Sequence, residues 1–197
     1  MTFRLQSTGY SLLELTFVVG LMSTVSAIAL PQMLTGLDDS RAVGAARYMS
    51  TRFQRARMEA VMRSADVALR FTQNGSRYSY AVYLDGNGNG VLARDIQRGL
   101  DRLIAPPEQL SDHFTGVDFG TIPGLPAVDP GGAPPGADPI RLGAGSFATF
   151  SAAGTATPGS VYIRGRADAQ YVDRIYGTTG KTRVLKFDRR ARKWRPL

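Results

Sequence analysis

One glycine-rich segment carries carboxylate and amide oxygens at alternate positions. It reads Asp85-Gly86-Asn87-Gly88-Asn89-Gly90, and Asp95 follows it. Oxygen atoms at alternate positions can converge on one Ca²⁺ ion, and a glycine in sixth place permits the sharp turn of such a loop. The closing acid of the EF-hand pattern would fall at Ile96, and turn chemistry alone also favours Asn, Asp and Gly after a strand. Two interpretations stay open, a plain turn or a calcium site formed by Asp85, Asn87, Asn89 and Asp95.

The C-terminal end of the chain has an excess of basic side chains. Residues 162–197 hold 11 Lys and Arg against three Asp, a net charge of +8 that equals the net charge of the whole chain. Clustered cations favour salt-sensitive, sequence-independent contacts with nucleic-acid phosphates, and aromatic rings can stack on bases. The alternative is that these residues face solvent, acidic surfaces or anionic lipid headgroups. The candidate nucleic-acid contacts are Lys181, Arg183, Arg189, Arg190 and Arg192, with Tyr176 and Trp194 for stacking.

The composition excludes several classes of site. The chain has no Cys, so disulfides, thiol nucleophiles and Cys-ligated zinc are excluded. His113 is the single histidine, which argues against His-rich metal sites and most acid–base schemes that use imidazole. The sequence contains no nucleophile motif and no phosphate loop. We therefore expect a protein without enzymatic activity and without a cofactor other than the calcium ion considered above.

An apolar run from Leu12 to Leu30 dominates the N-terminal part of the chain. As a helix it would be about 28 Å long, enough to span a bilayer core. Arg4 precedes the run, so the positive-inside rule keeps the first residues cytoplasmic and sends the rest outward. Glu14 interrupts the run, and a carboxylate at membrane depth costs about 2.5–3.5 kcal/mol, so it needs a partner. An ordinary signal peptide cleaved near residue 30 is the alternative, but the helical pattern continues beyond Pro31.

The residues at the start of this run resemble a known processing signal. Gly9-Tyr10-Ser11-Leu12-Leu13-Glu14-Leu15 is similar to the class III signal of type IV pilins and type II secretion pseudopilins. That signal consists of Gly, an aromatic residue, Ser or Thr, two apolar residues and Glu. The resemblance implies that a membrane-embedded prepilin peptidase cleaves after Gly9 and methylates the amine of Tyr10. It also implies that Glu14 pairs with the terminal amine of a neighbouring subunit and fixes axial register in a filament. Pro31 matches a position at which pilins often carry a helix-bending proline.

A second helical pattern follows and predicts that the helix continues as a stem to about residue 65. Small and apolar residues recur every three or four positions, at Ala42, Ala46, Met49, Phe53, Ala56 and Ala60. We expect this stripe to pack on a sheet, with a local interruption at Asp38-Asp39-Ser40. The stretch from Arg55 to Val61 resembles the helix end of the GspH/FimT branch of pseudopilins. Four arginines fall off the stripe and are expected to face solvent, or else to contact nucleic acid: Arg41, Arg52, Arg55 and Arg63.

Strand patterns occupy the rest of the chain. Asn74-Gly75 between two alternating runs is a strong hairpin signal. Three strand pairs are expected: Val67–Thr72 with Arg77–Leu84, Phe147–Ser151 with Ser160–Arg164, and Tyr171–Tyr176 with Thr182–Phe187. Residues 105–145 hold eight of the eleven prolines, which predicts a long Pro/Gly-rich loop. Six or so antiparallel strands against the stem helix give an α+β, pilin-like fold.

The resemblance as a whole implies a GspH/FimT-like pseudopilin or minor pilin. The expected segments are a leader peptide at 1–9, a transmembrane and filament-core helix at 10–33, an amphipathic stem at 34–65 and a β-rich domain at 66–197. The protein would cross the inner membrane of a Gram-negative bacterium once, with its C-terminal domain in the periplasm. After processing it would join other pilins or pseudopilins and prime or cap a filament of a secretion system or a pilus.

A DNA-binding minor pilin is the alternative function. Gly180-Lys181-Thr182-Arg183 resembles the Gly-Arg-x-Arg stretch of FimT-type minor pilins, in which basic residues have a role in DNA uptake. Lys181 replaces the first arginine of that stretch. Under this alternative DNA is a partner of the chain in addition to other pilins.

Overall fold

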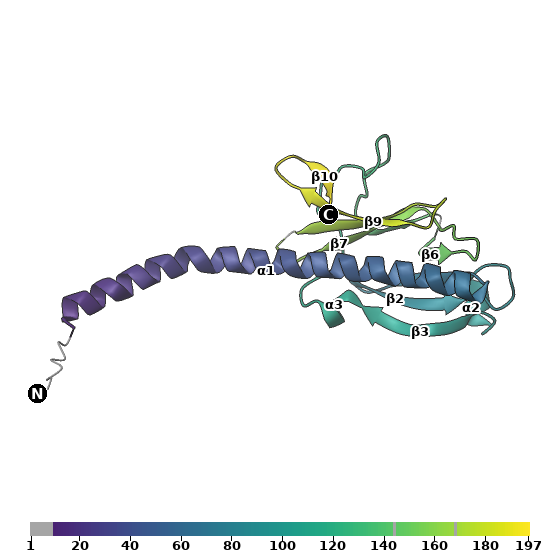
Figure 1. The fold of residues 1–197 in the computed structure, drawn as a ribbon, viewed down its shortest axis with the longest axis horizontal. Coiled ribbons are helices and arrows are strands. Elements are labelled where there is room, and N and C mark those ends of the chain that lie inside the picture. The colour runs from purple at the N-terminus through teal and green to yellow at the C-terminus, as the bar shows by residue number, and fades with distance from the viewer. Residues whose placement is uncertain (1–9, 144, 168) are drawn as a thin grey trace, which may run out of the picture. The chain divides into compact units, whose positions relative to one another are not determined.

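The first element of the chain is a long helix, α1 (Leu12–Arg63), which belongs to two units (Figure 1). The structure is a computed structural model that describes residues 10–143, 145–167 and 169–197. The first unit ends at Leu37 and the second comprises Asp38–Leu197. The second unit therefore contains the residues of α1 from Asp38 to Arg63, the domain part of the helix, together with all the strands. No interruption occurs at residues 38–40, because the side chains of Asp38 and Asp39 bond to the domain and leave the helical backbone intact.

The domain contains two antiparallel sheets. The smaller sheet has the strand order β3-β2-β1-β6. Its strands are β1 (Val67–Asn74), β2 (Arg77–Leu84), β3 (Arg102–Gln109) and β6 (Phe147–Phe150). The larger sheet has the order β10-β9-β8-β7-β4, and β5 also pairs with β7. Its strands are β4 (Asp118–Phe119), β5 (Ile140–Leu142), β7 (Gly159–Arg164), β8 (Gln170–Ile175), β9 (Thr182–Asp188) and β10 (Lys193–Pro196). Two short helices, α2 (Ala93–Gln97) and α3 (Leu110–His113), flank β3.

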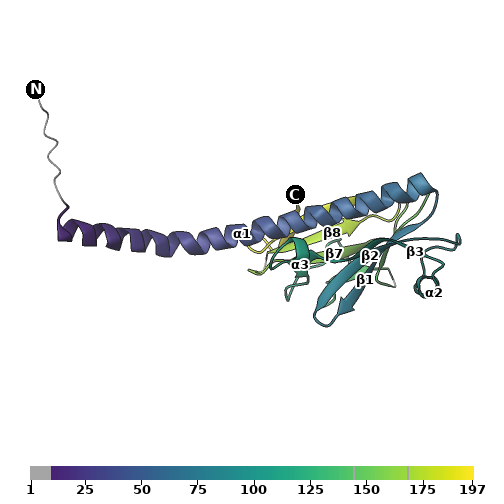
Figure 2. The same ribbon diagram turned by 90° about the horizontal axis from the view of Figure 1, so that it is seen from below.

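The main core joins the domain part of α1 to both sheets. In Figure 1, β2 and β3 lie on one side of this part of the helix and β7 and β9 lie on the other. Figure 2 shows β1, β2, β7 and β8 beneath the helix, so that one helix covers both sheets. The predicted stripe from Ala42 to Ala60 is buried throughout, which confirms the helical periodicity. Phe53 packs near Phe71 of β1 and Phe150 of β6, with ring centroids 6.5 and 6.1 Å apart.

Two of the three predicted strand pairs are confirmed and one is wrong. The β1–β2 hairpin turns at Gly75, whose φ of 63° is natural for glycine, and β8 pairs with β9. In contrast, β6 pairs with β1, and β7 pairs with β8 in the other sheet. Residues 151–158 carry the chain from one sheet to the other. The choice of partner strand is a long-range property that neighbouring patterns in the sequence do not contain.

The segment 105–145 contains more regular structure than the sequence predicted. The strand β3 runs through Pro106 and Pro107 to Gln109, and α3, β4 and β5 follow. Prolines are tolerated there because β3 is the outer strand of its sheet, and its pairing with β2 is irregular between Tyr80 and Val82. The stretch 120–139 has no helix or strand, as expected for its content of Pro and Gly.

Candidate functional site

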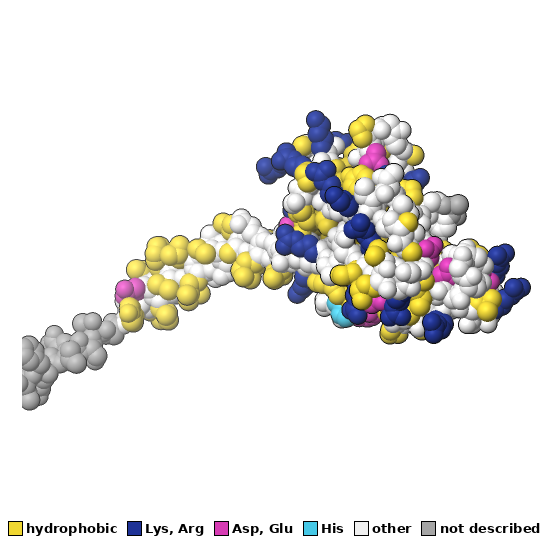
Figure 3. Space-filling model, turned by 45° about the vertical axis from the view of Figure 1, so that its right-hand side comes forward, with side chains coloured by type: hydrophobic (Ala, Val, Ile, Leu, Met, Phe, Trp, Pro, Cys, Tyr) yellow, Lys and Arg dark blue, Asp and Glu magenta, His cyan; other side chains and the backbone are white. Residues whose placement is uncertain are grey.

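The helix of the first unit presents an apolar surface that is exposed along its described length. Every residue from Tyr10 to Leu37 is exposed, with exposed fractions of 82% for Leu12, 80% for Leu13 and 71% for Phe17. The helix contains a window of mean hydropathy 1.9 in which no residue is buried. Figure 3 shows these apolar side chains in yellow along the helix. An exposed apolar surface of this extent is a surface for lipid or for other apolar helices.

The predicted processing signal adjoins the start of α1. Ser11 lies at the N-cap: its hydroxyl accepts a hydrogen bond from the Glu14 N–H at 3.2 Å, and its carbonyl accepts one from the Leu15 N–H at 3.1 Å. Glu14 is exposed in the first turn of the helix, where a negative charge is favourable. Gly9 lies outside the described residues, and Tyr10 is 84% exposed. The spacing Ser-x-x-Glu, which is the sequence signature of a capping box, could have shown from the sequence that the helix begins here.

The first turn of α1 within the domain is tied to the larger sheet by two adjacent aspartates. The buried carboxylate of Asp38 accepts hydrogen bonds from the backbone N–H groups of Arg166 and Ala167, at 2.8 and 2.7 Å. Asp39 accepts one from the Tyr171 hydroxyl at 2.9 Å and one from Lys186 Nζ at 2.7 Å. Burial and the hydrogen bond to Asp39 raise the pKa of Tyr171 above its ordinary value. These contacts fix the position of the helix on the sheet.

A second polar network joins α1 to the smaller sheet. Glu108 of β3 accepts hydrogen bonds from the hydroxyls of Tyr48 and Tyr80, both at 2.8 Å, and forms an ion pair with Arg52. Burial opposes ionisation of Glu108, but the hydrogen bonds from Tyr80, Arg52 and Tyr48 outweigh it and lower the pKa of this carboxyl. The expectation that Arg52 faces solvent is therefore wrong, because its guanidinium is held by Glu108 and by the Tyr48 hydroxyl. The network missed by the sequence analysis also includes His113, whose ring centroid lies 5.2 Å from that of Tyr48.

The aspartates of the glycine-rich segment are occupied by hydrogen bonds. Asp85 Oδ1 accepts from the N–H groups of Asn87 and Gly88, at 3.0 and 2.9 Å, and Oδ2 accepts from the Gly90 N–H at 2.8 Å. Asp95 Oδ2 accepts from the Asn89 side-chain amide at 3.0 Å, which holds the pKa of Asp95 below its ordinary value. Within residues 10–143, 145–167 and 169–197 no group of three or more His, Cys, Asp or Glu could hold a metal ion. This geometry favours the interpretation as a turn.

The basic residues of the β8–β9 turn point away from the core. Thr182 faces α1, where its hydroxyl lies 2.9 Å from Ser50 Oγ and accepts a hydrogen bond from Gln54 Nε2 at 2.8 Å. Lys181 and Arg183, on either side of Thr182, are exposed on the opposite face of the strand. The side chains proposed for phosphate contacts at this turn are therefore accessible.

The other basic cluster lies at the far end of β9. Asp188 Oδ1 accepts hydrogen bonds from the N–H groups of Arg190 and Ala191, which shapes the β9–β10 turn and leaves Arg189, Arg190 and Arg192 exposed. A seven-residue strand is about 20 Å long, so the two predicted clusters do not form one site. Trp194, the other candidate for stacking on bases, is half-buried: its indole N–H donates to the Pro126 carbonyl at 3.1 Å and its ring packs on Phe187, so its stacking on bases stays a prediction. Lys and Arg side chains gather on this upper part of the domain in Figure 3.

Two comparisons with known proteins give a match to this chain. The family model described as type II transport protein GspH matches residues 45–180. The chain is also 36% identical over 84 residues to the Pilin-like protein PilA1 of Thermus thermophilus. This match covers 41% of the chain and 50% of the relative, so the chain spans about half the length of that curated protein. No solved structure matches the chain.

Proposed function

The chain belongs to the GspH family of type II transport proteins, and we propose that it is a pseudopilin subunit that enters a filament through the apolar half of α1. Pilin-like proteins assemble with one another and have a structural, noncatalytic role. The observation that carries the proposal is the exposure of every residue from Tyr10 to Leu37 in one continuous helix. Lipid covers such a surface before assembly, and the helices of other subunits cover it afterwards.

Processing follows from the same part of the chain. Residues 1–9 are the leader, a prepilin peptidase cleaves after Gly9, and the amine of Tyr10 becomes methylated. Residues 10–33 then anchor the subunit in the inner membrane, and the amphipathic half of the stem, residues 34–65, leads to the β-rich domain, residues 66–197, in the periplasm. The resemblance to the class III signal supports the cleavage position, and the N-cap at Ser11 supports a helix that begins directly after it.

Glu14 provides the register for assembly. It is the only charged residue between Tyr10 and Leu37, and it is exposed on the apolar helix. Once apolar helices surround it, this carboxylate must pair with a cation, and the amine of a neighbouring Tyr10 supplies one. In this proposal the subunit primes or caps the filament.

Mass spectrometry of the subunit isolated from membranes tests the proposal. We expect an N-terminal peptide that begins at a methylated Tyr10 and an intact helix from Leu12 onwards. A mature protein that begins near residue 30 would instead be a secreted product and would exclude the anchoring helix. Gold labelling of the domain on isolated filaments tests the second step, because a priming or capping subunit is found at filament ends and a major subunit along their length.

A second function, DNA binding, is favoured by the outward orientation of Lys181 and Arg183 near the exposed ring of Tyr176. Cations on an exposed turn next to an aromatic ring suit phosphates and bases.

We expect the full chain in detergent to retard duplex DNA at low salt, and the Lys181→Ala/Arg183→Ala variant to lose retardation. The Arg190→Ala/Arg192→Ala variant removes equal charge from the separate β9–β10 turn and serves as the matched control. Equal loss in both variants would show nonspecific attraction, and no retardation at low salt would exclude this function.

A further inference from the structure

A row of polar side chains crosses the outer face of the larger sheet. The residues paired across adjacent strands are, in order, Arg141 (β5), Ser160 (β7), Arg174 (β8) and Arg183 (β9). Directly paired side chains lie on the same face of a sheet, with Cβ atoms about 4.5–5.5 Å apart. Arg174 and Arg183 are therefore like charges in opposed positions, an arrangement that destabilises a sheet unless an anion lies near them.

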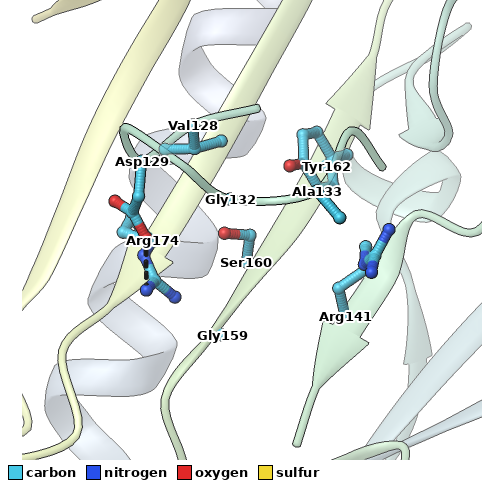
Figure 4. Close-up of a pocket in the computed structure, with 9 residues that line it drawn as sticks. All are labelled: Val128, Asp129, Gly132, Ala133, Arg141, Gly159, Ser160, Tyr162 and Arg174. Atoms are coloured by element: carbon cyan, nitrogen blue, oxygen red, sulfur yellow. Dashed lines mark ion pairs between the residues drawn. The ribbon is translucent and has the colours of Figure 1, made fainter. Parts of the chain in front are cut away.

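A cavity of about 170 Å³ lies over this row (Figure 4). The sheet forms one wall and a segment without regular structure, residues 128–133, forms the other. In Figure 4 the Ser160 side chain points toward Arg174, and Arg141 lies on the other side of β7. Burial raises the pKa of the Tyr162 phenol, whereas its hydrogen bond with Ser160 and the two nearby guanidinium groups lower it. The cavity thus combines two hydroxyls with two arginines.

Asp129 shows what kind of group the cavity accepts. Its carboxylate forms an ion pair with Arg174, with Oδ2 2.5 Å from a terminal guanidinium nitrogen. This contact does not use the full donor capacity of the arginine, because Arg174 Nε is buried and has no hydrogen-bond partner among the described residues. A planar guanidinium binds a carboxylate best through two parallel hydrogen bonds. The cavity can therefore hold a carboxylate more completely than Asp129 does.

We propose that this cavity binds the carboxylate of an acidic side chain from a partner protein, which replaces Asp129 on Arg174. The cavity lining carries the positive charges of Arg141 and Arg174, and it keeps both when Asp129 withdraws. Asp129 lies in a segment without helix or strand, so its withdrawal breaks no strand pairing. The partner carboxylate then accepts from Arg174 in a cavity that Ser160 and Arg141 also line, Arg141 with one terminal nitrogen donating to the Pro134 carbonyl at 2.6 Å. The site is separate from the apolar helix and adds a specific contact for the globular domain.

The single tryptophan of the chain makes binding measurable. The ring centroid of Trp194 lies 5.9 Å from that of Tyr162, which lines the cavity. We would titrate the full chain in detergent with a capped peptide that contains two glutamates and follow tryptophan fluorescence. The matched peptide carries two glutamines instead, and oligothymidylate supplies phosphodiesters. A saturable change with the acidic peptide is expected, and none with the glutamine peptide.

Variants of the cavity decide the assignment. Asp129→Asn should bind the acidic peptide more tightly, because the competing carboxylate is gone, and a gain of affinity cannot arise from misfolding. Arg174→Gln and the exposed Arg141→Gln should each weaken binding by about tenfold or more. Arg98→Gln removes the same charge from an exposed position outside the cavity and should leave the affinity unchanged.

Three results would overturn the proposal. They are an equal response to both peptides, unchanged affinity in the two arginine variants, and tighter binding of oligothymidylate through the same arginines. The last result would identify a phosphate site instead of a carboxylate site. The measurement needs neither processing nor filaments, so its failure is distinguishable from a failure of the proposed pseudopilin function.

Discussion

Asp39 on α1 accepts a hydrogen bond at 2.9 Å from the hydroxyl of Tyr171, a residue 132 positions later in the chain. Together with Lys186, this bond holds the helix against the larger sheet at the point where the domain begins. The helix that the filament is proposed to use for assembly is thus continuous with one that is fixed in the domain core.

The Asp39–Tyr171 bond predicts a measurable contribution to stability. Tyr171→Phe removes the hydroxyl from a ring that is 1% exposed and should lower the free energy of unfolding by about 1–2 kcal/mol. Urea denaturation of the full chain in detergent measures this change. Tyr176→Phe, at an exposed tyrosine just beyond β8, is the matched control and should change stability little. Equal effects of the two substitutions would contradict a specific role of the bond.

Alkaline pH should reduce the stability that the same hydroxyl provides, because the tyrosine ionises more readily in the unfolded chain than in the folded one. The pKa of Tyr171 is raised by burial and by Asp39, and the pKa of Tyr80 is raised by burial and by Glu108. The stability that these hydroxyls provide is complete below pH of about 10, the ordinary pKa of tyrosine, and declines above it. We expect stability to fall steeply above this pH, and less steeply in the Tyr171→Phe variant. An identical decline in both proteins would assign the effect to other groups.

Gly165 leaves the space that the Asp38 carboxylate occupies, because glycine has no Cβ atom. A Cβ atom at this position would lie 2.6 Å from Asp38 Oδ2, so alanine must displace the carboxylate from the N–H groups of Arg166 and Ala167. Gly165→Ala should therefore destabilise the domain by about 1–3 kcal/mol. Gly145→Ala is the control, because its Cβ would meet only Phe147 at 3.7 Å, an ordinary contact distance. Thermal unfolding followed by circular dichroism distinguishes the two variants, and equal melting temperatures would exclude the clash.

Local patterns in the sequence predicted much of the fold. The stripe on α1 and the hairpin at Asn74-Gly75 depend on spacing within a few residues, and both are confirmed. Pairings between distant strands, such as Val67 with Phe150, depend on which elements meet in space and were missed. The arginine row was missed for the same reason, because it exists only when the registers of β5, β7, β8 and β9 are known. The Ser11 cap was present in the sequence as a local signal and was overlooked.

We expect Asp173 to make the free energy of unfolding depend on pH in the acidic range. The side chain lies on β8, is completely buried, and neither of its oxygens has a hydrogen-bond partner among the described residues. Burial raises the pKa of this carboxyl well above its ordinary value. The free energy of unfolding is therefore highest with respect to this group below pH of about 4, where both states are protonated, and it falls as pH rises towards the pKa of the folded state.

Asp173→Asn should remove this dependence, because the amide does not ionise. We expect the variant to be more stable than the native chain at neutral pH and to show a flatter profile of unfolding free energy between pH of about 4 and 8. Asp188→Asn is a control for which the opposite change in stability is expected. The N–H groups of Ala191 and Arg190 hold the pKa of Asp188 below its ordinary value. That variant should lose stability at neutral pH. If the free energy of unfolding of Asp173→Asn depended on pH in the same way as that of the native chain, this carboxyl would be ionised in the folded protein.

Glu14 tests whether charge or shape governs entry into the filament. Glu14→Gln retains the size of the side chain and removes the charge, so the amine of a neighbouring Tyr10 would be left without its partner among apolar helices. Loss of one partner of a buried ion pair costs about 3–5 kcal/mol, and incorporation should fall by about tenfold or more. The measurement is the fraction of subunit that sediments with sheared filaments.

Glu14→Asp keeps the charge and should retain part of the incorporation. Both variants should still be inserted and cleaved after Gly9, which the mass of the N-terminal peptide verifies. Cleaved Glu14→Gln that enters filaments as well as the native subunit would contradict the pairing, because helix packing alone would then set the register.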